Sequence, residues 1–457
     1  MTDFRNLLQE NRDNHLDELK QFLSIASVSA LSEHKEDVLK GAEWTADALK
    51  KAGMENVKIM PTKRHPVVYG DWLKAEGKPT ALIYGHYDVQ PVDPIELWET
   101  QPFEPDIRDD KIYARGATDD KGQVFMHIKA LETILHKNGE LPLNIKFCIE
   151  GEEEIGSPNL DDFVEDQKDL LAADVLVVSD NPMIEEGKPT VCYGLRGLCG
   201  MQIDIKGAKG DLHSGLYGGA VQNPIHALTE LLATMHDEVN GRITIDGFYD
   251  AVEPLKDEER QAYADLNFDE GKMREELDVP ELFGEEGYSA LERMWVRPTL
   301  EVNGIYGGFQ GEGIKTVLPS EAHAKITCRL VPDQDPAEIA KLIRKHIESN
   351  TPEGVTVETT LFDQGKPFVT PFDHPAIQAA GRALEKSYGV APAFTRMGGS
   401  IPVVETFSEL LKLPVVMLGF GLPDENFHAP NEHFHLENFD KGLETLCDYW
   451  FELERSL

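Results

Sequence analysis

The sequence has few positive charges and no long hydrophobic run. Its 457 residues include 44 Lys and Arg against 82 Asp and Glu, a formal net charge of -38. This excess repels phosphate backbones and anionic lipid surfaces, so nucleic acid and membrane are not expected partners. No stretch approaches the ~20 consecutive apolar residues that are needed to cross a bilayer.

Cysteine is also scarce. The five cysteines are scattered and form no CxxC motif, so we expect neither a disulfide framework nor a thiolate zinc site. The charged N-terminal stretch MTDFRNLLQENRDNHLDELKQFL lacks the apolar segment of a secretory signal. Together these absences predict a cytoplasmic protein.

The length and the apolar pattern predict an α/β protein of more than one domain. At ~150 residues per domain, 457 residues indicate two or three folding units. Short apolar runs alternate with helical patterns such as Val124–His136, which is typical of a largely parallel sheet with helices on both faces. The runs are Pro66–Tyr69, Thr80–Gly85, Leu143–Ile149, Ala173–Ser179 and Pro414–Gly419.

A different order of elements runs from Gly194 to His374. The pattern is β-α-β-β-α-β, which predicts a ferredoxin-like α+β domain inserted into the first. We therefore expect a first domain of residues 1–193 and 375–457 and an inserted domain of residues 194–374. The acidic stretch Asp250–Met294 is interpreted as an embellishment of the insert. The expected elements of the insert are strand Leu198–Lys206, helix Val221–His236, strands Thr299–Ile305 and Ala322–Val331, helix Pro336–Ser349 and strand Val355–Phe362.

Polar side chains that can bind metal follow the predicted core strands almost at once. In open α/β sheets, ligands bind beyond the carboxyl ends of the strands, so these side chains can converge. They are His86 and Asp88 after ALIYG, Glu150 and Glu152–Glu154 after LNIKFCI, Asp180 after ADVLVVS, and His428 after a loop that follows PVVMLGFG. Asp119 and Asp120, just before a predicted helix, add another source.

Histidines with several carboxylates predict a site for Zn²⁺, or for Mn²⁺ or Co²⁺. Two such ions ~3.5 to 4 Å apart repel one another unless a carboxylate bridges them. A further carboxylate has to stay free of metal if it is to take a proton from water. The adjacent pair Glu153 and Glu154 suits these two tasks.

Seven motifs, in order along nearly the whole chain, resemble those of the M20 family of metallopeptidases, and most closely its branch of nonspecific dipeptidases and carnosinases. They are GHYDVQP, RGATDDKGQ, EGEEEIGS, SDNP, DLHSG, GGSIPV and FHAPNEHF. The resemblance implies a zinc-peptidase-like catalytic domain, with the insert acting as lid and dimerisation domain. It also implies hydrolysis of an amide bond in a dipeptide or short peptide.

The resemblance assigns roles at the metal site residue by residue. Asp119 bridges two divalent ions, of which His86 and Asp180 complete one, and Glu154 and His428 the other. Glu153 is the general base for a water shared by the ions, and Asp88 orients His86. In the run EEE, the roles of ligand and base have to be assigned among Glu152, Glu153 and Glu154. Alignment to the following Ile155-Gly156-Ser157 favours Glu153 as base and Glu154 as ligand. His433 and His435 compete with His428, which the following Ala-Pro-Asn-Glu favours.

The resemblance also assigns residues to the substrate. His213, in the insert, donates to the oxyanion from the partner subunit of a homodimer. Arg329 holds the terminal carboxylate of the substrate. The residues expected to act with Arg329 are Thr316, His374, Gly399 and Ser400.

Three alternatives remain open at this point. An N-acyl-amino-acid deacylase or a carboxypeptidase of the same family has the same sheet, metals and base, and differs only in its pocket. An inactive binding scaffold predicts the loss of a ligand or of the base, whereas every expected position is filled here.

Overall fold

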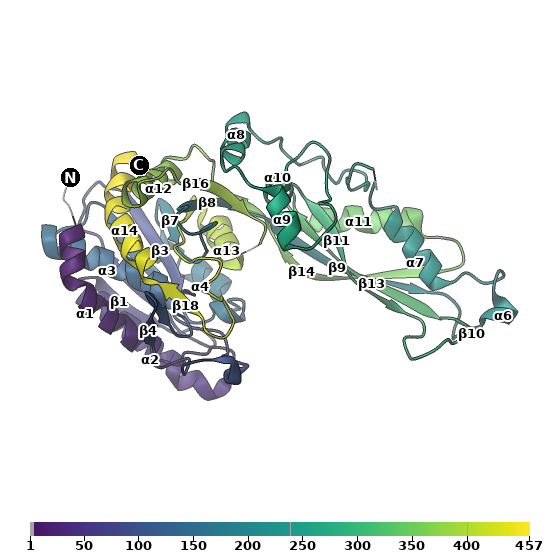
Figure 1. Ribbon diagram of the computed structural model, residues 1–457, viewed down its shortest axis with the longest axis horizontal. Helices are drawn as coiled ribbons and strands as arrows, with labels where there is room; N and C mark the ends of the chain where they lie inside the picture. Colours follow the sequence, from purple (N-terminus) through teal and green to yellow (C-terminus); the bar gives the residue numbers. More distant parts are fainter. Residues whose placement is uncertain (1–3, 238, 400) are drawn as a thin grey trace. The chain divides into compact units, whose positions relative to one another are not determined.

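The computed structural model describes residues 4–237, 239–399 and 401–457 (Figure 1). It divides into two compact units, the first made of Met1–Tyr193, Thr370–Thr395 and Pro402–Leu457, and the second of Gly194–Val369 and Arg396–Ile401. The insert was predicted to end at His374, but unit 2 ends at Val369 and also takes in the later segment Arg396–Ile401. This segment belongs to unit 2 because Arg196 donates its backbone N–H to the carbonyl of Met397 (3.1 Å) and its Nε to that of Gly398 (3.2 Å).

The sheet of unit 1 has a parallel centre. Strands β6 (Asn144–Glu150), β3 (Thr80–His86), β7 (Val175–Val178) and β17 (Val415–Met417) run parallel in that order. Antiparallel strands flank them: β2 (Val67–Trp72) and β1 (Glu55–Met60) beside β6, and β8 (Thr190–Leu195) beside β17. β15 (Phe368–Val369) and β16 (Ala393–Met397) pair with β8. The central strands are almost wholly buried, which explains their mainly apolar sequences.

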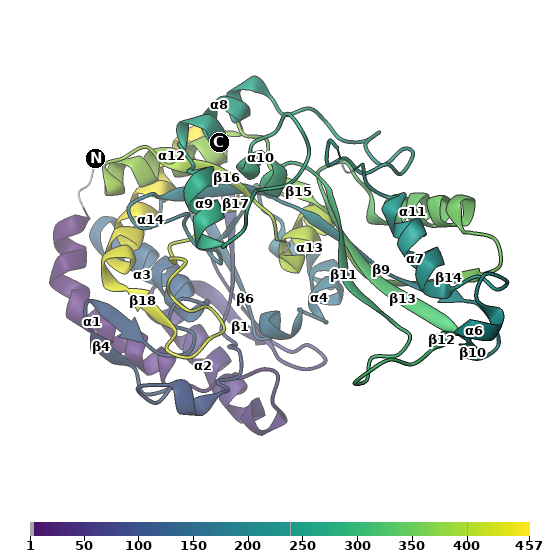
Figure 2. The same cartoon turned by 45° about the vertical axis from the view of Figure 1, so that its right-hand side comes forward.

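Helices cover both faces of this sheet, as predicted. On one face lie α3 (Lys121–Asn138), α12 (Pro375–Tyr388) and α14 (Leu436–Ser456), with α1 (Arg5–Leu23) and α2 (Lys35–Lys51) packed beside α3. The opposite face carries α4 (Leu160–Asp166) and α13 (Pro402–Leu411), which pack on each other (Figures 1 and 2). A small three-stranded sheet orders β18 (His433–His435), β5 (Lys111–Tyr113) and β4 (Asp106–Arg108).

Unit 2 has the predicted ferredoxin-like order. The chain runs through β9 (Gly197–Lys206), α7 (Pro224–Ala233), β11 (Thr299–Gly307), β13 (Glu321–Leu330), α11 (Pro336–Asn350) and β14 (Thr356–Gly365). The strands form an antiparallel sheet in the order β11-β13-β9-β14. Helices α7 and α11 pack on this sheet over alternating apolar residues of β9 such as Met201 and Ile203. Helix α7 starts at Pro224, because the Asn223 side chain accepts the N–H of Ile225 (2.9 Å).

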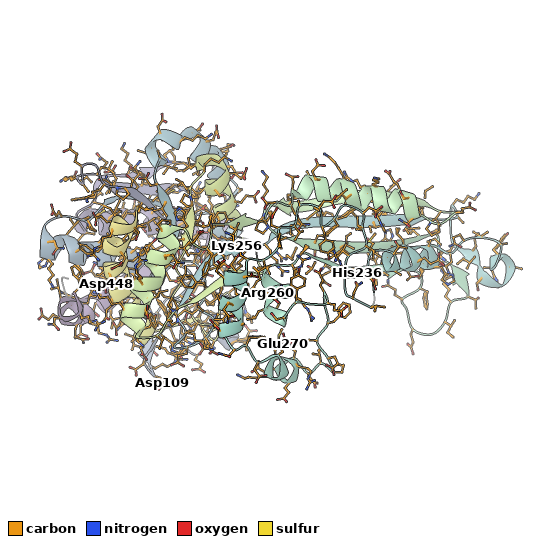
Figure 3. All side chains as sticks on the ribbon, turned by 90° about the horizontal axis from the view of Figure 1, so that it is seen from above. Asp109, His236, Lys256, Arg260, Glu270 and Asp448 are labelled. Carbon is orange, nitrogen blue, oxygen red and sulfur yellow. The ribbon has the colours of Figure 1, made fainter. Side chains whose placement is uncertain are left out.

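The acidic stretch Asp250–Met294 is folded and belongs to unit 2. It contains α8 (Asp257–Asp265), α9 (Glu270–Glu276) and most of α10 (Ala290–Trp295). Arg260 on α8 pairs with Glu292 on α10 (2.9 Å), and Glu270 on α9 accepts the N–H of Ala290 (2.6 Å); Figure 3 labels Arg260 and Glu270. None of the helices in the described residues combines the length and the apolar composition that crossing a membrane requires.

Candidate metal centre

Two groups of side chains with the donor atoms of a metal site lie at the carboxyl ends of the parallel strands of unit 1. His86 is the last residue of β3, and Asp180 follows β7 after one residue. Glu154 lies in the short turn after β6, and Asp119 precedes α3 by two positions. His428 comes from the loop after β17, where its backbone adopts a positive φ of 57°. These are the five residues predicted as metal ligands.

Asp119 belongs to both groups. Its Oδ1 lies 3.1 Å from Nε2 of His86, which lies 3.8 Å from Asp180 Oδ1. Its Oδ2 lies 2.8 Å from Nε2 of His428, which lies 3.3 Å from Glu154 Oε2. The two oxygens of one carboxylate therefore face two different donor groups, which is the arrangement of a bridging ligand.

The donor spacing fits a metal ion in each group. Within each group the three ligand atoms all lie within 4.8 Å of one another. Three donors ~3.5 Å apart have a common centre about 2 Å from each, which is the usual length of Zn–N and Zn–O bonds. One imidazole and two carboxylates on each side suit a borderline divalent cation.

The three consecutive glutamates have different surroundings. The Glu152 carboxylate is buried and accepts the N–H of His65 (2.5 Å) and the side chain of Asn159 (2.6 Å), so its role is structural. Glu154 belongs to one metal group. Glu153 is in neither group, and its carboxylate has no hydrogen-bond partner among the described residues. A carboxylate that binds no metal is free to accept a proton.

Asp88 contacts both sides of the site. His86 Nδ1 lies 3.0 Å from the backbone carbonyl of Asp88 and 3.5 Å from its carboxylate. The carbonyl is the nearer acceptor, and the bond leaves Nε2 free for metal. The Asp88 carboxylate instead accepts the backbone N–H groups of Glu153 (3.3 Å) and Glu154 (3.1 Å). Asp88 thus joins the His86 strand end to the turn that carries both glutamates.

The centre holds several carboxylates away from solvent, and this shifts their pKa values. Burial raises the pKa of Glu153 to about 7 and that of Glu154 to about 9, and neighbouring carboxylates add to the rise. Burial also raises the pKa of Asp180. For Asp119, hydrogen bonds with His428 and His86 outweigh burial and hold the pKa well below its usual range. Bound cations relieve this crowding of carboxylates.

The residues predicted to bind substrate fall in separate places. Arg329, near the end of β13, lines a cavity of about 790 Å³ in unit 2 together with Arg196 and Glu301. His213 and Thr316 lie near each other elsewhere in unit 2. His213 is on β10 (Leu212–His213), which pairs with β12 (Val317–Leu318), and Thr316, just before β12, accepts the N–H of Ser214 at its carbonyl oxygen (3.1 Å). Residues Thr316 and Gly399 do not line the cavity.

His374 belongs to unit 1, where it caps α12 by accepting the N–H of Ala376 at Nδ1 (3.2 Å). Gly399 belongs to unit 2. Ser400 lies outside the described residues.

Arg196 was not predicted. Burial, followed by repulsion from Arg329, lowers its pKa to about 10. Four arginines and two glutamates line this cavity, and the excess of positive side chains favours an anion there. One feature of the sequence pointed to Arg196: it lies in LRG at the start of the insert, two residues before Leu198. Leu198 is the residue that pairs with Arg329 across the sheet.

The model of one peptidase family, described as Peptidase family M20/M25/M40, matches residues 82–452. The chain belongs to this family. A curated relative in Candida albicans, a Cys-Gly metallodipeptidase, is 34% identical over 97% of this chain and 95% of its own. The human Beta-Ala-His dipeptidase is 31% identical over 97% of this chain and 90% of its own.

A solved structure of a relative agrees with the fold. The M20 family metallo-carboxypeptidase of Sulfolobus solfataricus is 33% identical, with a TM-score of 0.80 over 96% of this chain and 99% of its own. The α/β fold, the family and the metallopeptidase class predicted from sequence are thereby confirmed.

Two buried carboxylates of this M20/M25/M40 peptidase hold the loops that carry the candidate metal ligands, and sequence reasoning missed both. Glu432 accepts the backbone N–H groups of Gly116 (3.0 Å), Thr118 (3.1 Å) and Asp119 (3.2 Å), and pairs with Arg115 (2.7 Å). It follows His428 by four residues, so it ties the loop of one ligand to the loop of another. Glu432 is the Glu of APNE, and this motif was the only feature of the sequence that pointed to it.

Glu425 supports the same loop from the other side. Its carboxylate accepts the Thr118 hydroxyl (2.6 Å) and the backbone N–H groups of Leu422 and His435 (both 2.9 Å). Burial raises the pKa of Glu425 to about 8.

The metal-free protein is expected to lose stability as pH rises from about 5.5 to 8.5. The folded pKa values of Glu153 and Glu154 are raised above their unfolded values, and the hydrogen bond with Asp119 raises the pKa of His428 to about 9. At these three groups the folded chain therefore holds more protons than the unfolded chain over this range, and their contribution to stability falls with pH. A tenfold difference in proton affinity between the two states amounts to about 1.4 kcal/mol, so Tm falls by several degrees.

The measurement is Tm against pH by calorimetry, with and without Zn²⁺. Metal ligation requires deprotonated carboxylates and neutral imidazoles, so the rise in Tm on adding Zn²⁺ is expected to grow with pH. A metal-free Tm that stays level or climbs across this range contradicts the assignment of the raised pKa values to the centre.

Proposed function

We propose that this peptidase hydrolyses dipeptides at a centre of two divalent metal ions, Zn²⁺ before Mn²⁺ or Co²⁺. The observation that supports it most is the pair of donor groups that share Asp119, with Glu153 outside both. His86 and Asp180 would hold one ion, and Glu154 and His428 the other. Such ions, when bound, polarise the scissile carbonyl and lower the pKa of water.

The residues of the chain supply the proton transfers. The Glu153 carboxylate takes a proton from the attacking water and returns it to the leaving amine, which is the work of a general base and then a general acid. A half-buried carboxylate that belongs to neither donor group is suited to both steps. Asp88 and Glu432 hold the loops of the site in place through backbone N–H groups.

Dipeptides are the favoured substrates because the two curated relatives are named for Cys-Gly and Beta-Ala-His dipeptide hydrolysis. The metallo-carboxypeptidase relative of similar identity favours, as the second candidate, removal of a C-terminal residue from longer peptides. Both reactions place a free carboxylate on the substrate, and the Arg196–Arg329 cavity has the charge to receive it.

The test is release of amino acids, detected with ninhydrin, from Cys-Gly, β-Ala-His, other dipeptides, longer peptides and N-acyl amino acids. The proposal expects metal-dependent hydrolysis of dipeptides with much less turnover of the other two classes. Preference for longer peptides moves the assignment to a carboxypeptidase, and preference for N-acyl amino acids to a deacylase. A protein that carries both metals and cleaves nothing is the binding scaffold.

Arg329→Met is expected to raise KM for dipeptides by about 10- to 100-fold, because a charge-assisted hydrogen bond contributes ~1.5 to 3 kcal/mol. The value of kcat should change much less if the carboxylate, which takes no part in the bond changes, is held equally in the ground state and the transition state. Steady-state kinetics measures both constants. Lys325→Met, an exposed cation on the same strand β13, is the matched control and should leave KM as it is. An unchanged KM in Arg329→Met removes the residue from the substrate site.

We further propose that the enzyme is a homodimer in which the partner subunit supplies His213. Arg329 and Glu321 lie near opposite ends of β13, about 26 Å apart at ~3.3 Å per residue. His213 and Thr316 lie beyond the Glu321 end, on β10 and next to β12. A dipeptide cannot reach both ends of this strand within one chain, which supports the proposal that the His213 acting with Arg329 on one substrate comes from a second copy.

Complementation tests the shared site. His213→Ala and Glu153→Gln should each be inactive alone, whereas their mixed dimer holds one site with an intact Glu153 and an intact His213. If subunits exchange at random, about a quarter of the wild-type sites are restored. The measurement is dipeptidase activity after coexpression of both variants. No recovery in a dimer shown to be mixed contradicts donation from the partner.

We also propose that the enzyme acts in the cytoplasm. The five cysteines are buried thiols, and thiols are kept reduced in that compartment.

A further inference from the structure

A third group of potential metal ligands lies outside the centre described above. It consists of Asp424, His433 and His435, whose donor atoms all lie within 4.8 Å of one another. It shares no residue with the two groups around Asp119. His433 and His435 are two residues apart on the short strand β18, so their side chains point to the same face.

One imidazole of this group is already oriented as a metal ligand usually is. His433 is 4% exposed, and its Nδ1 donates to the backbone carbonyl of Asn431 (2.9 Å). This bond places the lone pair on Nε2, as the second hydrogen bond of a metal-binding histidine does. His435 Nε2 lies 3.2 Å from Asp424 Oδ2. Two imidazoles and one carboxylate therefore meet at one place.

A cation already occupies the space between these groups. The Lys111 ammonium lies 3.1 Å from His433 Nε2 and 3.5 Å from Asp424 Oδ2. Lys111 lies opposite His435 in the pairing of β5 with β18, and its side chain is 22% exposed. The flexible stem of lysine lets the ammonium move out to water. The three donors thus attract positive charge, and the Lys111 ammonium that lies there now can be displaced.

We propose that Asp424, His433 and His435 form a third metal site, which takes a divalent cation such as Zn²⁺ when the Lys111 ammonium moves away. Two imidazole nitrogens and a carboxylate oxygen match Zn²⁺ in type and number, with water as a fourth ligand. Competition with an ammonium makes this site weaker than the two at Asp119.

An ion at this site stabilises the loop that carries a ligand of the main centre. The site spans residues 424–435, and this segment includes both His428 and Glu432. The N–H of His435 is held by Glu425, whose carboxylate also binds the Thr118 hydroxyl beside Asp119. An ion that joins Asp424 to β18 therefore fixes the loop at both ends, and raises the Tm of the loaded enzyme.

The test is Zn²⁺ content at buffered free Zn²⁺, measured by equilibrium dialysis and atomic spectroscopy on the full chain. Wild type should bind two ions tightly and a third more weakly. His435→Gln and Asp424→Asn should each lose only the third ion, and Lys111→Met should bind it about tenfold more tightly. His226→Gln, an exposed histidine on α7, is the matched control and should bind all three.

A separate variant keeps this result independent of the proposed function. Asp119→Asn, which removes the shared ligand of the main centre, should still bind one ion that is lost when His435→Gln is added. Co²⁺ bound to this variant should give a visible absorption band that the double variant lacks. The proposal is overturned if His435→Gln and Asp424→Asn keep the third ion. It is also overturned if Lys111→Met leaves the affinity unchanged, since Lys111 then belongs to a fixed hydrogen-bonded network.

Discussion

Replacing Glu153 with Gln is expected to lower kcat for dipeptides by about 10²- to 10⁴-fold, the contribution of a positioned general base. Both metal ions should stay bound, because Glu153 belongs to neither donor group. The amide has nearly the shape of the carboxylate but cannot accept the proton of the attacking water. Steady-state kinetics and metal content, measured on the same preparation, check the two halves of this prediction.

Glu152→Gln is the matched control for this substitution. Glu152 is the neighbouring residue, but its carboxylate holds His65 and Asn159 and belongs to neither donor group. Its replacement should lower Tm more than it lowers kcat. Activity of Glu153→Gln within tenfold of wild type, or loss of a metal ion from it, shows that another group accepts the proton.

Asp119→Asn is expected to remove both ions from the centre and to abolish hydrolysis. One of the two carboxylate oxygens faces His86 and the other faces His428, so one substitution weakens both sites. An amide cannot bridge two cations with two anionic oxygens, and the affinity should fall by more than about 100-fold, the upper end for outer-shell partners of a metal.

Asp180→Asn shows whether Asp119 is shared. Asp180 belongs only to the group of His86, so its replacement should release one ion and leave the other. Metal content after dialysis distinguishes the two variants. If Asp119→Asn keeps one tightly bound ion at the centre, the bridging assignment is wrong.

The sequence predicted the parts of the fold that come from continuous apolar runs. β3, β6 and β7 are buried on both faces, so their sequences are mainly apolar and easy to identify. The antiparallel strand β8 was missed, although it too is buried. The end of the insert was also misplaced, since hydrogen bonds between Arg196 and the later segment at Met397 and Gly398 join residues about 200 positions apart.

The metal ligands were predictable for a geometrical reason. Parallel strands end at one edge of the sheet, and His86 and Asp180 lie at or just after strand ends. The roles within Glu152–Glu154 were not decided by spacing, since adjacent glutamates differ only in what surrounds them. Glu432 was missed because its partners at Arg115 and Asp119 are over 300 residues away, and a buried pair of that kind leaves no local pattern.

Crystals soaked with Zn²⁺ and measured at the zinc absorption edge test the central claim most directly. The account predicts two strong anomalous peaks about 3.5 to 4 Å apart, one on each side of Asp119, with Glu153 bound to neither. A single peak at this position, or a peak coordinated by Glu153, contradicts it.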